Sequence, residues 1–158
     1  FKVGDRFLTD RKGLGLMSPI NNKALTSFIP PKRGEPIITQ FPLNPQIMFI
    51  KRVIGLPGDV ISLDKLGLKI NDNTYSLNQI EDFELHSEDK VILHDQYELS
   101  VGEYDWKFIV KKKEKFPIIE KTLIPEEGYF LLGDNLTGSS DSRYFGAIPE
   151  SYFSGRVK

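Results

Sequence analysis

A lysine inside an apolar stretch is the first residue of this sequence that could do chemistry. Lys51 lies in the segment 48–54, whose other members are Met, Phe, Ile, Arg, Val and Ile. Burial disfavours the charged form of an amine, so Lys51 either reaches water or is held neutral. Lowering the pKa of a lysine from about 10.4 to about 7.4 costs about 4 kcal/mol, which apolar neighbours supply by desolvation. The segment thus predicts a candidate general base, although an ordinary exposed Lys-Arg pair at a strand end is the commoner arrangement.

A second group of polar residues offers partners for such a lysine. A neutral amine needs a hydrogen-bond partner that does not favour its charged form, and a serine hydroxyl meets this need where a carboxylate does not. The hydroxyl-rich loop 137–142 contains such serines. Asp134 and Asp141 of the same region need cations, and Arg52 and Arg143 are available. The expected constellation is one apolar lysine, one serine donor and two arginine–aspartate pairs.

These residues must be positioned by strands, because no segment has a sustained helical period. Alternating or β-branched runs predict strands at 36–41, within 49–59, at 60–63 and at 128–132. The polar residues 133–146 form a loop that follows the last of these strands. Loops on rigid strands are where functional residues concentrate. We therefore expect an all-β fold with little helix.

The amino-terminal part is expected to be less regular. Residues 1–8 alternate as a half-buried strand does, and residues 9–35 are rich in Gly, Pro and Asn and are predicted as loop. Apolar residues within 14–29 either attach this loop to the core or form a surface that touches lipid. Both possibilities remain open from the sequence.

The middle of the chain differs in composition and is predicted to be an inserted β lobe. Residues 65–121 are more charged and contain hairpin-sized segments, with a predicted hairpin at 68–75 and strands at 97–101 and 106–110. The remaining ranges, 1–64 and 122–158, form the predicted core lobe.

Composition excludes several classes of function. The formal net charge of the 158 residues is −1, so no overall positive charge draws the chain to nucleic acid. The absence of cysteine excludes a thiol nucleophile and a thiolate zinc site. His86 and His94 fit two solvated side chains better than a zinc site, and the basic run 111–115 fits a solvated hairpin tip. No apolar run approaches the roughly 20 residues of a membrane span. No metal or organic cofactor is implied.

Two of these segments resemble the signature boxes of type I signal peptidases. They are Lys-Arg-Val-Ile-Gly-Leu-Pro-Gly-Asp at 51–59, and Gly-Asp-Asn at 133–135 followed by Ser-Ser-Asp-Ser-Arg at 139–143. The segment 32–38 resembles the box before the lysine strand, and residues 1–5 resemble the stretch after the nucleophile box. The resemblance spans the chain apart from the insert, and it implies a signal-peptidase-like antiparallel β-sheet core with an inserted smaller β lobe.

The resemblance implies a membrane-bound serine endopeptidase that uses a Ser–Lys dyad. Such enzymes cleave signal peptides from exported preproteins on the outer face of the cytoplasmic membrane. By position, Lys51 is the general base, Ser139 orients its amine, and Arg52–Asp134 and Asp141–Arg143 are structural pairs. The expected substrate-binding residues line shallow apolar pockets or flank the bound peptide, and they are Phe1, Phe7, Ile38, Met48, Phe49 and Ile50.

The sequence departs from the family pattern at its start and inside one box. The nucleophile box is absent, and by alignment the serine lies five positions before Phe1, together with the oxyanion-hole groups and the membrane anchor. We therefore expect the isolated chain to be inactive. Leu136 replaces the usual arginine, which is expected to loosen a loop contact without abolishing activity. Glu35-Pro36 replaces an aspartate and an aliphatic residue.

Three other functions compete with the endopeptidase. One is a non-catalytic relative that binds peptides or assists assembly, but such a protein has no need for a costly apolar lysine. Another is a self-cleaving repressor, for which neither a DNA-binding helical domain nor a cleavage segment is visible. The last is a β-barrel nucleic-acid module resting on 111–115, which the balanced net charge disfavours.

Overall fold

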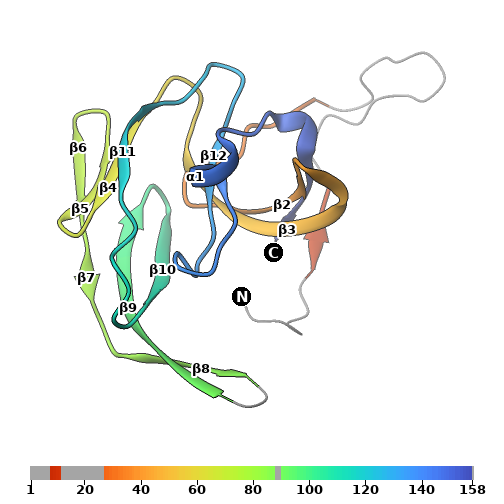
Figure 1. Ribbon diagram of the computed structural model, residues 1–158. Coiled ribbons are helices and arrows are strands. Elements are labelled where there is room, and N and C mark those ends of the chain that lie inside the picture. The colour runs from red at the N-terminus through yellow and green to blue at the C-terminus, as the bar shows by residue number, and fades with distance from the viewer. Residues whose placement is uncertain (1–7, 12–26, 88–89, 158) are drawn as a thin grey trace.

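A computed structural model describes residues 8–11, 27–87 and 90–157 (Figure 1). Antiparallel strands make up most of this part of the chain, and the helices are one short α-helix and one 3-10 turn, α1 (Ser142–Phe145) and η1 (Glu150–Tyr152). The expected all-β fold with little helix is confirmed. It follows from the sequence, because alternating β-branched and aromatic residues fit half-buried strands.

The first sheet carries the candidate lysine. Its five strands follow the order β1-β13-β2-β3-β12. Their bounds are β1 Thr9–Asp10, β13 Phe153–Val157, β2 Pro36–Phe41, β3 Asn44–Gly55 and β12 Phe130–Leu132. The short strand β12 pairs with β3 only at residues 52, 53 and 55. On that side, residues 48–51 of β3 have no strand partner among the described strands.

Two smaller sheets complete the molecule. One is formed by β11 (Ile119–Leu123), β4 (Val60–Asp64), β5 (Gly67–Ile70) and β6 (Asn73–Ser76). The other is formed by β10 (Tyr104–Lys111), β9 (Lys90–Val101), β7 (Asn78–Gln79) and β8 (Phe83–Ser87). In Figure 1 the β8–β9 hairpin extends away from the rest of the molecule.

The largest buried cluster joins the smaller sheets to the end of the lysine strand. It contains Ile54, Leu63 and Leu68 together with Trp106 and Leu136. Its members therefore come from the ranges 1–64, 65–121 and 122–158. The division into a core lobe and an inserted lobe stays a prediction. A second cluster, which includes Ile37, Val53 and Leu131, fills the first sheet's buried face.

Several local predictions are corrected. Residues 9–10, expected in a loop, form β1 and pair with β13. The strand expected at 97–101 starts at residue 90, and β8 pairs with its first half. His94 is consequently flanked by β8 and β10 and is only 1% exposed, so the expectation of two solvated histidines is wrong for this residue. The side chain of His86 is exposed.

Candidate active site

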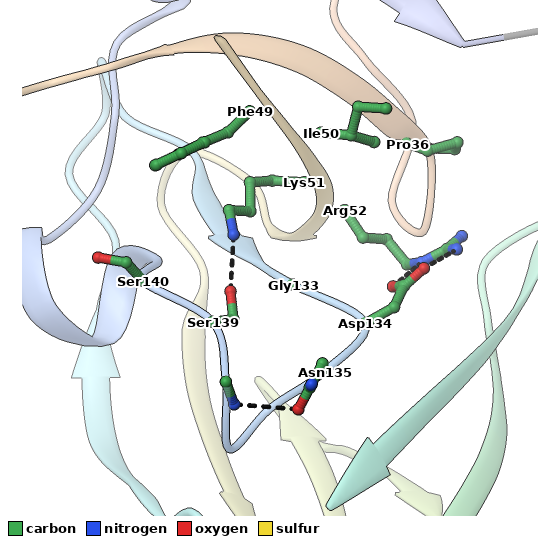
Figure 2. Close-up of a pocket in the computed structure, with 11 residues that line it drawn as sticks. Pro36, Phe49, Ile50, Lys51, Arg52, Gly133, Asp134, Asn135, Ser139 and Ser140 are labelled. Carbon is green, nitrogen blue, oxygen red and sulfur yellow. Dashed lines mark hydrogen bonds and ion pairs between the residues drawn. The ribbon is translucent and has the colours of Figure 1, made fainter. Parts of the chain in front are cut away.

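Lys51 and Ser139 are brought together from distant parts of the sequence. Lys51 is half-buried on β3, opposite Ile37 of β2. Its Nζ donates a hydrogen bond to Ser139 Oγ at 2.6 Å (Figure 2). The ring of Phe49 lies 4.9 Å from Nζ and covers one side of the amine. Lys51 therefore does not extend freely into water, which was the arrangement that would have removed it as a candidate base.

Burial is the main influence on the pKa of Lys51. It lowers this pKa below the usual value of 10.5, because the charged ammonium loses hydration. The charges of Asp141 and Asp134 act in the opposite direction, and the charge of Arg143 adds to the lowering. The net direction is downward, so the neutral amine forms at lower pH than it does in a solvated lysine.

The loop that carries Ser139 is closed at its base and tightly folded. The backbone N–H of Gly133 donates to Asp141 Oδ2 at 3.1 Å. Inside the loop, Gly138 N donates to the Asn135 side chain at 3.0 Å. These bonds restrict the backbone conformation of the loop on both sides of Ser139, and they thereby fix the position of Ser139 relative to β3.

Because Gly133 has no side chain, it leaves space for Lys51 Nζ and Ser139 Oγ. A Cβ atom on this residue would lie 2.1 Å from Ser139 Oγ and 3.2 Å from Lys51 Nζ. No side chain fits there unless Ser139 moves. A glycine at this position is thus required by the close approach of the loop to the lysine strand.

Two ion pairs support the site on either side. Arg52 donates from Nε and Nη2 to the carboxylate of Asp134, both at 3.0 Å. Arg143 donates from Nε and Nη2 to Asp141 at 2.7 and 2.8 Å. Asp141 is fully buried and also caps α1 by accepting from the Arg143 N–H. A buried carboxylate of this kind needs its cation, and breaking the pair would leave an uncompensated charge.

An open cleft of about 450 Å³ lies over the lysine (Figure 2). Its lining residues come from β3, from Pro36 and from the loop, and they are Pro36, Phe49, Ile50, Lys51, Arg52, Gly133, Asp134, Asn135, Gly138, Ser139 and Ser140. The unpaired stretch 48–51 of β3 borders this cleft. An extended peptide placed there would find free backbone groups of β3 for hydrogen bonding.

The expected substrate-binding residues have different positions. Phe49 and Ile50 line the cleft and are half-buried, and Met48 is 50% exposed on the same strand. Ile38 is half-buried on β2 opposite Ile50. Phe1 and Phe7 lie outside the described residues, as does most of the segment 14–29. Phe28 packs against the second cluster, whereas Ile29 is 58% exposed.

Other sequence features fall outside the site. In the basic run 111–115, Lys111 pairs with Glu114 and Lys112 with Asp82, so acidic neighbours accompany both. Leu136 is 1% exposed and belongs to the main cluster. The expected loosening at this position stays a prediction. Across the described ranges, no group of three or more acidic or histidine side chains could hold a metal ion, and no helix has the length and apolar character to cross a membrane.

Sequence reasoning missed one residue of strand β10 that contacts the site. Trp106 Nε1 donates to Asp134 Oδ1 at 2.9 Å, although 28 residues separate the two. A local pattern cannot reveal this contact, because it depends on how β10 lies against the loop. The only signal was that Trp106 is the chain's single tryptophan, within a predicted strand.

Comparison with known proteins shows which family this chain resembles. Residues 4–158 match the family described as signal peptidase, peptidase S26. The chain is 28% identical to signal peptidase I of Buchnera aphidicola subsp. Baizongia pistaciae, over 98% of the chain and 63% of that protein. It is 30% identical to signal peptidase I of Pseudomonas aeruginosa, over 91% of the chain and 50% of that protein. The chain thus spans between half and two-thirds of the length of these curated relatives.

A solved structure is also similar. The crystal structure of a signal peptidase I from Enterococcus faecalis superimposes with a TM-score of 0.50 at 25% sequence identity. The similarity covers 84% of this chain and 100% of the other.

Proposed function

Because the chain belongs to the signal peptidase family S26, we propose that it is the lysine-bearing part of a serine endopeptidase that removes signal peptides from exported preproteins. The observation that carries this proposal is the Lys51 amine, half-buried in an open cleft and 2.6 Å from Ser139 Oγ. A lysine with a lowered pKa, beside a hydroxyl and facing an open groove, is suited to act as a general base.

In the proposed mechanism Lys51 moves a proton twice. Its neutral amine takes the proton of a serine hydroxyl while that oxygen attacks the carbonyl carbon of the scissile peptide bond. The resulting ammonium then gives a proton to the leaving amine as the C–N bond breaks, which leaves an acyl-enzyme ester. Water, deprotonated by the same amine, then hydrolyses this ester and releases the new carboxyl end.

Ser139 orients the base in this scheme. One N–H of Lys51 is engaged by Ser139 Oγ, so the lone pair of the amine is directed elsewhere, toward the nucleophile. The Arg52–Asp134 pair joins the lysine strand to the start of the loop, and the Arg143–Asp141 pair supports the end of the loop.

The preprotein is proposed to bind as an extended strand along residues 48–51 of β3. Support comes from the unpaired edge of β3 and from the apolar side chains of Phe49 and Ile50 in the cleft. Shallow apolar pockets would admit small side chains near the cleavage point by excluding larger ones. Phe1, Phe7, Ile38 and Met48 are proposed to complete these contacts.

We also propose that the enzyme works at the outer face of the cytoplasmic membrane, where exported preproteins emerge. The family membership supports this location. Accessibility of the cleft to an added protease in spheroplasts, compared with inverted vesicles, would test the orientation.

The decisive test compares two lysine variants of the protein as its gene encodes it. Lys51→Met keeps the length of the side chain and removes the amine, and Lys107→Met makes the same change at an exposed lysine of β10. Cleavage of a peptide that spans a signal-peptide junction should be lost in Lys51→Met and retained in Lys107→Met. Full turnover in a correctly folded Lys51→Met protein would refute the proposed role.

A further inference from the structure

The loop that carries Ser139 is attached to the edge of a strand from the insert. Ile109 of β10 donates its N–H to the Asp134 carbonyl at 2.8 Å, and Leu136 N donates back to the Ile109 carbonyl at 2.9 Å. Asn135 therefore forms a parallel bridge with Ile109. The opposite edge of β10 is paired along its whole length with β9. The loop thus extends a sheet that belongs to the insert.

The attachment continues beyond the bridge. Lys111 N donates to Thr137 Oγ1 at 2.9 Å, two residues before Ser139. Successive backbone groups on one edge of β10 therefore fix the loop from Asp134 to Thr137. The position of Ser139 above the lysine depends on these bonds, because the chain between Thr137 and Ser139 is very short.

A side chain of β10 secures the start of the loop. Trp106 is fully buried, and its indole N–H donates to Asp134 Oδ1 at 2.9 Å. The same carboxylate accepts two bonds from Arg52, the neighbour of Lys51 on β3. Asp134 thus joins the lysine strand, the serine loop and the inserted strand through one carboxylate.

We propose that Trp106 is a positioning residue, which acts through Asp134 to set the place at which the loop presents Ser139 to Lys51. This inference rests on the proposed function of Lys51 as general base and of Ser139 as the residue that orients it. Trp106 is not itself among the residues that line the cleft, and it reaches the site through its bond to Asp134, which does line it. If the indole served only to fill the core, its N–H would not need to meet a charged acceptor. The bond to a carboxylate is charge-assisted and directional, which suits it to fixing a loop.

The test is Trp106→Phe in the protein as its gene encodes it, with Phe116→Leu as the matched control. Phe116 belongs to the same buried cluster but has no hydrogen bond to the loop. Trp106→Phe should lower kcat roughly tenfold to hundredfold with little change in KM, because misplaced catalytic groups slow the chemical step. It should also move the acidic limb of the pH–rate profile, where activity rises as Lys51 loses its proton, to higher pH, since a loosened loop lets water reach Lys51.

Phe116→Leu should lower the melting temperature while leaving the acidic limb in place. A merely structural role for Trp106 would give both variants the same result, with a lower melting temperature and an unmoved acidic limb. That outcome would overturn the proposal. If Trp106→Phe does not fold, Thr137→Val gives the same information at the other end of the attachment, where the side chain lies outside the buried clusters. Its prediction is again a lower kcat and a shifted acidic limb, and an unchanged profile would overturn the proposal.

A readout without turnover separates this inference from the proposed function. The rate at which a small acylating reagent modifies Lys51, followed against pH by peptide mass spectrometry, reports the pKa of that amine directly. If the wild-type protein cleaves no signal peptide but Trp106→Phe raises this pKa, the proposed function fails and the positioning role stands. If the wild-type protein cleaves and the pKa is the same in Trp106→Phe, the positioning role fails alone.

Discussion

The N–H of Gly133 donates to Asp141 Oδ2 at 3.1 Å, so the two ends of the loop that carries Ser139 are joined to each other. Asp141 in turn caps the short helix α1, and Gly133 directly follows β12. The loop is therefore fixed at its base by regular structure. Substitutions at Gly133 or Asp141 should therefore change the position of Ser139 relative to Lys51 without replacing either of these two residues.

Gly133→Ala should strongly reduce activity. The new Cβ would lie 2.1 Å from Ser139 Oγ, so Ser139 must move away from Lys51. We expect kcat to fall about a hundredfold, because a displacement near 1 Å has an effect of that order. Gly155→Ala is the control, since its Cβ would meet other atoms no closer than 3.4 Å. Wild-type kcat in Gly133→Ala would show that Ser139 need not be where the structure has it.

Lys51→Met should stabilise the protein near neutral pH. The folded state lowers the pKa of Lys51, so between that lowered pKa and 10.5 the unfolded chain binds more protons than the folded one. Stability contributed by this residue therefore rises with pH through the window and is lowest beneath it. Thermal melts should show a higher melting temperature for Lys51→Met below the window and a smaller difference at alkaline pH. A variant that is less stable than wild type at every pH would contradict the burial argument.

Ser139→Ala should impair Lys51 as a general base while leaving the fold intact. The amine would lose the hydroxyl at 2.6 Å and with it the orientation of its lone pair. We expect kcat to fall roughly a hundredfold to a thousandfold, within the range typical of general-base defects. Figure 2 shows the hydroxyl of the adjacent Ser140 directed away from the amine, so Ser140→Ala should have a far smaller effect. Steady-state kinetics on both variants would check this, and equal losses would count against an orienting role for Ser139.

Substitutions of Asp141 and of Arg143 should move the acidic limb of the pH–rate profile, which reports the pKa of Lys51, in opposite directions. The Asp141 charge raises the pKa of Lys51 and the Arg143 charge lowers it. Asp141→Asn should therefore shift the limb to lower pH, and Arg143→Met should shift it to higher pH. Both variants will be less stable, because Asp141 is fully buried beside its cation. Shifts of the same sign would show that loop disorder, and not charge, dominates the effect.

The sequence predicted the fold where a single segment determines its own structure. Residues 36–41 form β2, and the predicted hairpin at 68–75 matches β5 and β6 to within a residue at each end, because alternation and turn residues act locally. The length of strand β9 was underestimated, because its first residues pair with β8, and a pairing with another segment is not visible in a local pattern.

For the candidate site, the sequence supplied the residue types and the resemblance supplied their grouping. The Lys51–Ser139 contact spans 88 residues, and no periodic pattern encodes such a distance. The Trp106–Asp134 bond was missed for the same reason. In the sequence, Asp134 has Arg52 and Arg143 as candidate partners, and nothing indicates that Trp106 of β10 also donates a hydrogen bond to it.

The separation in sequence between Lys51 and the loop that packs over its amine has a consequence for biosynthesis. While the polypeptide leaves the ribosome, Lys51 emerges 88 residues before Ser139. Throughout that interval its amine is an ordinary hydrated cation, since the walls that remove its water have not been made. The base required by the proposed function therefore forms only after the loop that carries Ser139 has been synthesised and has folded onto β3.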